Sequence, residues 1–363
     1  MEIPEILTAA WREYGDRRQL LAVQEISVNV STNHVYRLKL SDGKEFIAKV
    51  SSYGSFVHFR QDHQRIQQWS ELLESSGFRS FLARVATRKD GSTFVHKQGR
   101  RWVAFYHKVP FYDFLPARLD ELEIRALGRN LALFHKASLR AAGHLQPTWK
   151  SVGSDIAGLY DALESVDWRL ERGISSAQEL VLKGHCDAFL ENSERLGYHE
   201  WPKLPILIDW NIGNFSVGYD GRGFRFFSRW DYDWFRIEPR GFDFYFAARV
   251  VRESGDQAVF SYTADPLLEP RFVTFLRAYH ARFPLLEAEI LFLKEAYRFF
   301  ILNYVVHAGE HFFDTSLWHR LMQEALDAYL PSVERLDLRP LVDAVLAPPS
   351  PSEPPPSLPP PEE

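Results

Sequence analysis

The chain has two parts with different patterning, and this division limits its fold more than any other feature. Over roughly residues 20–110, short runs rich in apolar residues predict strands, and one helical pattern at 59–74 interrupts them. From residue 119 helical periodicity dominates, apart from strands at 205–231 that flank a hairpin signal at 220–223. We therefore predict an α+β fold, in which an antiparallel sheet with one helix precedes a mostly helical part.

The expected elements follow from this patterning. An amphipathic helix is predicted over 4–20, then strands at 26–30, 35–40, 45–50, 85–87, 93–96 and 101–109, and helices within 119–138, 156–196 and 260–330. We expect an N-terminal lobe of residues 1–108 and a helical C-terminal lobe of 109–346. The tail, 347–363, is rich in proline and acidic residues and cannot build a core.

Composition narrows the class of protein. The 363 residues are 45% hydrophobic and 25% charged, as in globular proteins, and the net charge of −5 gives no overall attraction to nucleic acid or anionic membranes. The single cysteine, Cys186, cannot form an intrachain disulfide. No apolar run approaches the roughly 20 residues that span a bilayer, and the N-terminus lacks signal-peptide character. We expect a cytoplasmic protein without nucleic-acid or membrane partners.

Three polar residues stand between apolar strands in the segment 204–243. Asp209 follows the apolar run 206–208, Asn214 comes five residues later, and Asp231 lies where the following hairpin ends. Phosphoryl transfer needs an acceptor for the proton of the attacking hydroxyl, and magnesium needs hard oxygen ligands. This spacing supplies one base and two metal ligands. The alternative is that all three are ordinary turn residues, because Asp and Asn favour turns.

This segment resembles the catalytic and metal-binding region of the aminoglycoside phosphotransferase, choline kinase and methylthioribose kinase group. The matching residues are Asp209-x4-Asn214, Asp231-x-Asp233 and the Gly-Phe-Asp sequence that ends at Asp243. The resemblance implies a bilobal protein-kinase-like fold, ATP and Mg²⁺ as cofactors, and transfer of the γ-phosphoryl group to a hydroxyl. It also implies that Asp209 is the base, that Asn214 and Asp231 bind magnesium, and that Asp243 braces the catalytic loop.

One position departs from the pattern of that group. Leu207 stands where the group has the histidine of its His-x-Asp loop, a residue that supports the loop. The departure favours a second hypothesis, a pseudokinase that keeps the fold and binds nucleotide without transferring phosphate.

The nucleotide is expected to bind in the N-terminal lobe. The turn that holds Ser31, Thr32 and Asn33 is similar to the phosphate-covering turn of choline and homoserine kinases, although it contains no glycine and also fits a plain hairpin turn. Lys49 lies among apolar residues of a predicted strand, where an inward lysine is costly unless paired. It resembles the third-strand lysine of kinases, and a surface lysine is the alternative.

That lysine is normally paired with an acid on the next helix. Asp62 is the predicted partner of Lys49, with Glu71 and Glu74 as alternatives if the helix phase differs. The strand 102–109 is expected to lead into the hinge between the lobes, where backbone groups near 105–108 would bind adenine.

The acceptor is expected to be a small molecule with a hydroxyl group. Aromatic residues crowd the catalytic segment, and rings can hold a cationic ammonium or stack on a sugar. Nearby acids, Asp233 and Glu238, would favour a cation, although most of the rings are also suited to the core. Choline-like compounds, amino alcohols, aminoglycosides and sugars all stay open as acceptors, and a protein serine or threonine is a less favoured one.

A separate motif suggests different chemistry. His307, Glu310 and His311 match the His-x-x-Glu-His pattern of a zinc protease family, which makes a zinc hydrolase the third hypothesis. Such a site also needs a downstream third ligand on a helix, and few helical residues remain after His311.

Overall fold

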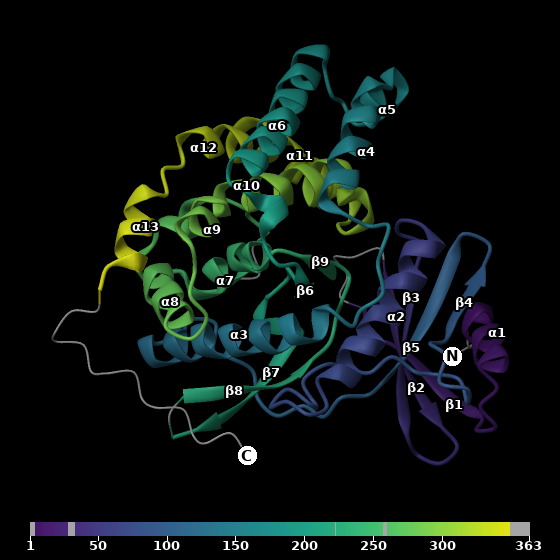
Figure 1. The fold of residues 1–363 in the computed structure, drawn as a ribbon. Helices are drawn as coiled ribbons and strands as arrows, with labels where there is room; N and C mark the ends of the chain where they lie inside the picture. The colour runs from purple at the N-terminus through teal and green to yellow at the C-terminus, as the bar shows by residue number, and fades with distance from the viewer. Residues whose placement is uncertain (1–3, 28–32, 222, 257–259, 349–363) are drawn as a thin grey trace.

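A computed structural model describes residues 4–27, 33–221, 223–256 and 260–348 of the chain. Figure 1 shows two lobes, a twisted sheet flanked by α1 and α2 and a larger assembly of helices. The predicted α+β class, an antiparallel-sheet lobe followed by a mostly helical lobe, is confirmed. Among the described residues, no helix is both long and apolar enough to cross a membrane.

The sheet of the N-terminal lobe is antiparallel, with the strand order β1-β2-β3-β5-β4. Its strands are β1 (Leu20–Glu25), β2 (His34–Leu40), β3 (Glu45–Ser51), β4 (Val95–Gln98) and β5 (Arg101–His107). Helix α1 (Glu5–Tyr14) packs on one face through Trp11, whose ring lies 5.7 Å from that of Phe46 and 5.4 Å from that of Phe105. Helix α2 (Phe56–Leu72) begins at Ser55, whose hydroxyl caps the N–H of His58.

The alternation of β3 decides which of its residues face the other lobe. Phe46, Ala48 and Val50 pack into the small core under α1. Because successive side chains of a strand point to opposite faces, Ile47 and Lys49 face the opposite side, where both line a cavity. The strand pattern therefore places the predicted lysine toward the helical lobe.

Several predicted boundaries were wrong. The first helix does not reach residue 20, because Gly15 takes a left-handed conformation (φ 77°) and ends it after Tyr14. The first strand is β1 and not 26–30, of which 28–30 fall outside the described residues. The strands predicted at 85–87 and 93–96 are mostly isolated bridges, Val85 with Tyr106 and Thr87 with Thr93, before β4.

The helical lobe is built around α3, whose N-terminus is fixed by a reciprocal capping box between Asp120 and Glu123. Its helices are α3 (Glu121–Ala142), α4 (Val152–Glu164), α5 (Val166–Glu171), α6 (Ser176–Arg195), α7 (Phe244–Val251), α8 (Pro270–His280), α9 (Glu287–Leu291), α10 (Leu293–Phe300), α11 (Thr315–Glu324), α12 (Leu330–Arg335) and α13 (Arg339–Leu346). Two antiparallel strand pairs lie among them, β6 (Leu204–Ile206) with β9 (Arg236–Glu238) and β7 (Phe215–Asp220) with β8 (Gly223–Arg229).

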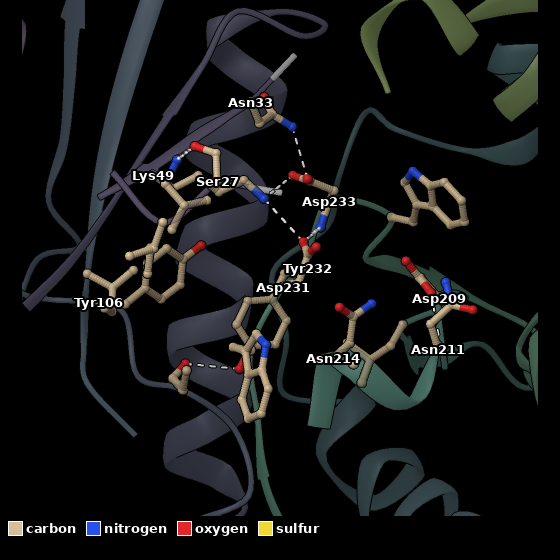
Figure 2. Close-up of a pocket in the computed structure, with 18 of the residues that line it drawn as sticks. Ser27, Asn33, Lys49, Tyr106, Asp209, Asn211, Asn214, Asp231, Tyr232 and Asp233 are labelled. Carbon is tan, nitrogen blue, oxygen red and sulfur yellow. Dashed lines mark hydrogen bonds and ion pairs between the residues drawn. The ribbon is translucent and has the colours of Figure 1, made fainter. Parts of the chain in front are cut away.

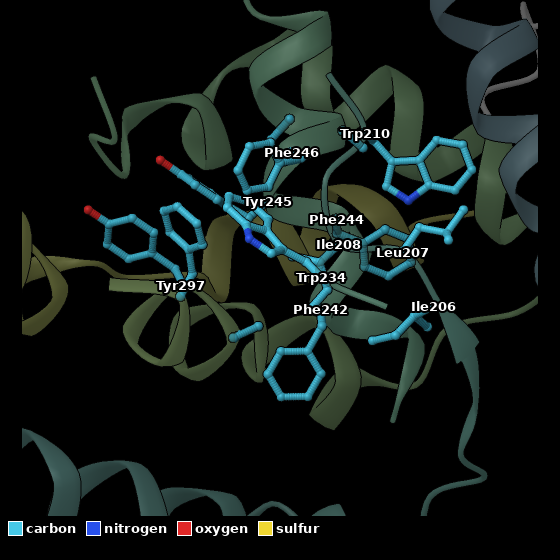
Figure 3. Packing of buried hydrophobic residues seen from close by; sticks show 14 of the residues in the cluster. Ile206, Leu207, Ile208, Trp210, Trp234, Phe242, Phe244, Tyr245, Phe246 and Tyr297 are labelled. Atoms are coloured by element: carbon cyan, nitrogen blue, oxygen red, sulfur yellow. The ribbon is translucent and has the colours of Figure 1, made fainter. Parts of the chain in front are cut away.

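The core of this lobe surrounds the loop that follows β6. Figure 3 shows Ile206, Leu207 and Ile208 packed among the aromatic side chains of the segment 242–246, and all three are at most 2% exposed. Gly128 allows α3 to lie against α8, since a Cβ atom there would stand 2.4 Å from the backbone oxygen of Phe275. A rigid apolar base therefore underlies the polar residues that follow Ile208.

Candidate active site

A cavity of about 620 Å³ lies between the sheet and the polar loops of the helical lobe. Its lining combines five of the predicted site residues: Asn33 from the segment before β2, Lys49 from β3, Asp209 and Asn214 after β6, and Asp231 after β8 (Figure 2). Ser31 and Thr32 fall outside the described residues. The structure thus brings chain segments about 180 residues apart, as between Lys49 and Asp231, into one site.

The loop that carries Asp209 is held by hydrogen bonds to the side chain of Asp243. One carboxylate oxygen of Asp243 accepts hydrogen bonds from the backbone N–H groups of Leu207 (3.1 Å) and Ile208 (2.6 Å). The other lies 2.8 Å from Nε2 of His135, whose Nδ1 is 2.7 Å from the Tyr279 hydroxyl. Asp243 and His135 are fully buried. Asp243 therefore occupies the bracing position that the resemblance implied.

The loop itself is strained where it is braced. Ile208 has φ 61°, a left-handed conformation that is costly for a β-branched residue. Such strain persists only where surrounding contacts impose it, and it is concentrated at functional sites. Here the two hydrogen bonds to Asp243 impose it, and the consequence is that Asp209 follows the bend and lines the cavity.

The environment of Asp209 makes it more basic than an ordinary aspartate. Burial in the cavity, reinforced by the nearby Asp231 carboxylate, raises the pKa of Asp209 to about 6. One of its carboxylate oxygens accepts a hydrogen bond from the Asn211 N–H at 3.1 Å. Asp209 is thus ionised near neutral pH and yet able to accept a proton readily.

The hairpin β7–β8 places the two predicted metal ligands. Asn214 directly precedes β7, and its backbone oxygen accepts a hydrogen bond from the N–H of Trp230 at 3.1 Å. Asp231 follows β8 with φ 69°, the second left-handed residue other than glycine in the described part of the chain. This bend directs Asp231 toward Lys49 (Figure 2).

Lys49 is the centre of the charged cluster. Its Nζ lies 3.2 Å from Oδ1 of Asp231 and forms a closer ion pair with Asp233, whose other carboxylate oxygen accepts from Nδ2 of Asn33 at 2.9 Å. Burial alone would lower the pKa of Lys49, but the carboxylates of Asp231 and Asp233 outweigh it and raise the pKa. Lys49 is therefore charged, and it connects the sheet to the loop after β8.

The predicted pairing of Lys49 with Asp62 is wrong. Asp62 lies on α2 but pairs with Lys150 of the helical lobe at 2.9 Å, and it does not line the cavity. The alternative acids are also engaged elsewhere: Glu71 accepts from Gln67, and Glu74 pairs with Arg84. The physical reason is that the two acids of the loop after β8 already surround Lys49.

The α2 helix instead presents His63 toward β5. The Tyr106 hydroxyl lies 2.6 Å from Nε2 of His63, and His63 Nδ1 lies 2.7 Å from the backbone oxygen of Phe59. Burial lowers the pKa of His63 to about 3, so this histidine is neutral. Tyr106, His107 and Lys108 line the cavity at the predicted hinge, whereas Phe105 packs toward α1.

One part of the cavity lining is aromatic. Its rings belong to Trp234, Phe260, Tyr262, Phe312 and Phe313. Of the aromatic residues that crowd the catalytic segment, Trp230, Tyr232 and Trp234 line the cavity. Trp210 and Tyr245 are instead core residues, 1% and 2% exposed.

Glu238 was wrongly expected near the acceptor. It is 1% exposed, and it bonds the hydroxyl of Tyr198 at 2.5 Å and the ammonium of Lys203 at 2.9 Å, away from the cavity lining.

The residues present fit magnesium. Asn214 and Asp231 offer an amide oxygen and a carboxylate, the hard donors that Mg²⁺ prefers, and this ion commonly takes its other ligands from phosphates and water. In the described part of the chain, no three His, Cys, Asp or Glu residues gather as a metal site. At the zinc-like motif, Glu310 pairs with Arg172 at 2.5 Å and lies 3.7 Å from His311.

Two residues near the site were missed by the sequence analysis. Arg229 donates hydrogen bonds to backbone oxygens of both polar loops, and Lys150 joins Asp62 to the backbone oxygen of Phe235. Neither carries a motif. The only signal was a basic residue inside an apolar strand pattern, at Arg229, two positions before Asp231.

Solved structures share the whole fold of the chain at low sequence identity. A microcompartment-associated aminopropanol kinase matches with a TM-score of 0.59 and 16% identity over 94% of this chain and 99% of that chain. Amicoumacin kinase hAmiN, in complex with AMP-PNP, Ca²⁺ and Ami, matches with a TM-score of 0.57 and 14% identity over 90% and 95%. A macrolide 2'-phosphotransferase type I matches with a TM-score of 0.53 and 12% identity over 89% and 96%.

These likenesses define the class of fold. The chain has the bilobal protein-kinase-like fold, as the sequence resemblance implied. Within that class, the structures it is similar to are small-molecule kinases and antibiotic phosphotransferases. No protein-family model and no curated protein sequence matches the chain.

Proposed function

We propose that the chain is an ATP-dependent phosphotransferase that moves the γ-phosphoryl group to a hydroxyl of a small molecule. The observation that carries the proposal is that Asp209, Asn214, Asp231 and Lys49 line one cavity in this fold. Residues 1–108 then form the nucleotide-binding lobe and 109–346 the lobe that carries the catalytic and metal-binding loops. The cytoplasm, which supplies ATP, is the proposed compartment.

The nucleotide would lie along the sheet side of the cavity. Lys49 would exchange its contacts with Asp231 and Asp233 for the phosphates, and the turn that contains Asn33 would cover them. Asn214 and Asp231 would hold magnesium. When bound, the metal neutralises charge on the phosphate oxygens and orients the transferred group.

Asp209 would act as the base. It accepts the proton of the acceptor hydroxyl while the oxygen of that hydroxyl forms a bond to the γ-phosphorus, and the bond from this phosphorus to the β–γ bridging oxygen breaks to release ADP. A pKa of about 6 suits this role, because the carboxylate is mostly ionised at neutral pH. The strained loop braced by Asp243 holds the base in place.

The acceptor would bind against the aromatic side of the cavity, next to Asp209. The rings of Trp234, Tyr262 and Phe312 offer flat apolar surfaces, which can hold an ammonium group or stack on a sugar ring. Choline-like compounds, amino alcohols, aminoglycosides and sugars are therefore the proposed acceptors.

The test is a screen of hydroxyl compounds for ADP release with Mg²⁺ and ATP, with protein serine and threonine acceptors included. An acceptor that raises ADP release and gains phosphate, with the signal lost in Asp231→Asn and without Mg²⁺, supports the proposal. Acceptor phosphorylation that is unchanged in Asp231→Asn would contradict it.

A nucleotide-binding pseudokinase is the second candidate. It is favoured by Leu207 in place of the loop histidine and by Lys49, which two carboxylates already engage. ATP would then raise the melting temperature with or without Mg²⁺, but ATP hydrolysis would stay at the background rate. Hydrolysis above background that depends on Mg²⁺ would exclude this candidate.

A further inference from the structure

Arg229 ends β8, two residues before Asp231, and its side chain is fully buried. Its backbone is fixed to the segment that follows α2. The Arg229 N–H donates to the oxygen of Phe81 at 2.5 Å, and the Arg229 oxygen accepts from the N–H of Ala83 at 2.9 Å. The residue therefore has a fixed backbone position between the two lobes.

A single nitrogen of this side chain contacts both polar loops. Nη2 donates to the backbone oxygen of Asp209 at 2.6 Å and to that of Asp231 at 3.3 Å. The guanidinium lies over the ring of Trp210, 5.0 Å from its centroid, so the ring limits its movement. The planar guanidinium of Arg229 thus links the Asp209 loop to the Asp231 loop and limits the distance between them.

Stability alone does not account for an arginine at this position. A buried guanidinium loses its hydration, and within the described part of the chain Nε and Nη1 of Arg229 have no hydrogen-bond partner. Buried polar atoms without partners are rare, and apolar residues often replace buried charges without loss of stability. What the arginine adds is a positive charge close to the two acids and a donor shared by both loops.

We propose that Arg229 is a positioning residue, which holds the Asp209 loop and the Asp231 loop at the separation that phosphoryl transfer requires. The inference rests on the proposed function. Because the side chain of Arg229 donates its hydrogen bonds to backbone oxygens of these loops, it acts through them and would not touch the substrates. A misplacement of about 1 Å can cost about 100-fold in rate, so loss of this contact should be visible in turnover.

The test compares Arg229→Gln, Arg229→Lys and the control Arg225→Gln. Arg225 lies on the same strand with its side chain 76% exposed, where it pairs with Asp220. The measurements are kcat and KM for ATP, including ATP hydrolysis without acceptor, together with ADP affinity and melting temperature. ADP affinity reports nucleotide binding separately from turnover.

The expected result is a fall in kcat of about 100-fold for Arg229→Gln with ADP affinity changed less than about threefold. Arg229→Lys keeps the charge and one donating nitrogen, so its kcat should be about tenfold higher than that of Arg229→Gln. The control Arg225→Gln should behave as wild type. If Arg229→Gln does not fold, Arg229→Lys with wild-type kcat overturns the inference. Equal losses of kcat and ADP affinity also overturn it. A wild-type protein without any transfer or hydrolysis overturns the proposed function and this inference together.

Discussion

Replacing Asp243 with asparagine tests whether the loop below the site needs a charged brace. The Asp243 carboxylate accepts from the N–H groups of Leu207 and Ile208 and contacts His135, all without solvent access. Asparagine has nearly the same shape and one acceptor oxygen, but it carries no charge. The change therefore removes the charge assistance and leaves the packing.

The magnitude follows from these contacts. A hydrogen bond to a charged group contributes about 1.5–3 kcal/mol and a neutral one about 0.5–1.5 kcal/mol, so weakening the two backbone bonds should lower the free energy of unfolding by about 2–3 kcal/mol. The same bonds hold Ile208 in its left-handed conformation, which costs about 1–3 kcal/mol. Partial relaxation of this bend would move Asp209, and we expect kcat to fall about 10- to 100-fold.

Urea unfolding and steady-state ADP release measure the two effects. The matched control is Asp161→Asn on the exposed face of α4, which should change the unfolding free energy by less than about 0.5 kcal/mol. Wild-type stability together with wild-type kcat in Asp243→Asn would refute the bracing role. A loss of stability without a loss of kcat would show that Asp243 supports the fold but does not position Asp209.

Three further predictions concern charge and protonation. Since the pKa of Asp209 is raised to about 6 and the base must be ionised, kcat should fall as the pH drops through 6, to about a tenth at pH 5; a flat profile between pH 5 and 8 would contradict this. His63, with its pKa lowered to about 3, takes up a proton only on unfolding, so it should lower the unfolding free energy by about 2 kcal/mol between pH 7.5 and 5, and urea melts of His63→Gln should lack this part of the slope. Lys49→Met removes the charge that would meet the phosphates, and the KM for ATP should rise about 10- to 100-fold; an unchanged KM would place the phosphates elsewhere.

The main features of the fold were predictable because they rest on periodicity. The β3 pattern placed Lys49 on an inward face, and the Asp209-x4-Asn214 spacing around apolar strands placed two polar groups at one cavity. The first strand was predicted too late in the chain, because the left-handed glycine at position 15 ends α1 early and lets β1 begin at Leu20. The end of α1 and the start of β1 depend on the packing of Trp11 against the sheet, which cannot be read from a local sequence pattern.

The partners of charged residues were not predictable in the same way. Asp62 was assigned to Lys49 by its place on the helix. Instead, Asp62 pairs with Lys150, which is distant in sequence, and Lys49 pairs with Asp233 in the loop after β8. Arg229 was missed because a basic residue inside an apolar strand pattern does not by itself show that its side chain is buried. Such pairings depend on which distant chain segments come into contact in the fold. Sequence periodicity shows which face of an element is buried, but it does not show which segments meet.

Turnover of Asp209→Ala, measured beside its affinity for ATP, tests most directly whether one base and two metal ligands work together at the floor of this cavity. We predict that phosphoryl transfer slows by about 1,000-fold, within the range for loss of a general base, while the dissociation constant for the nucleotide with Mg²⁺ stays within about threefold of wild type. Transfer at the wild-type rate would show that Asp209 is not the base and would contradict the account.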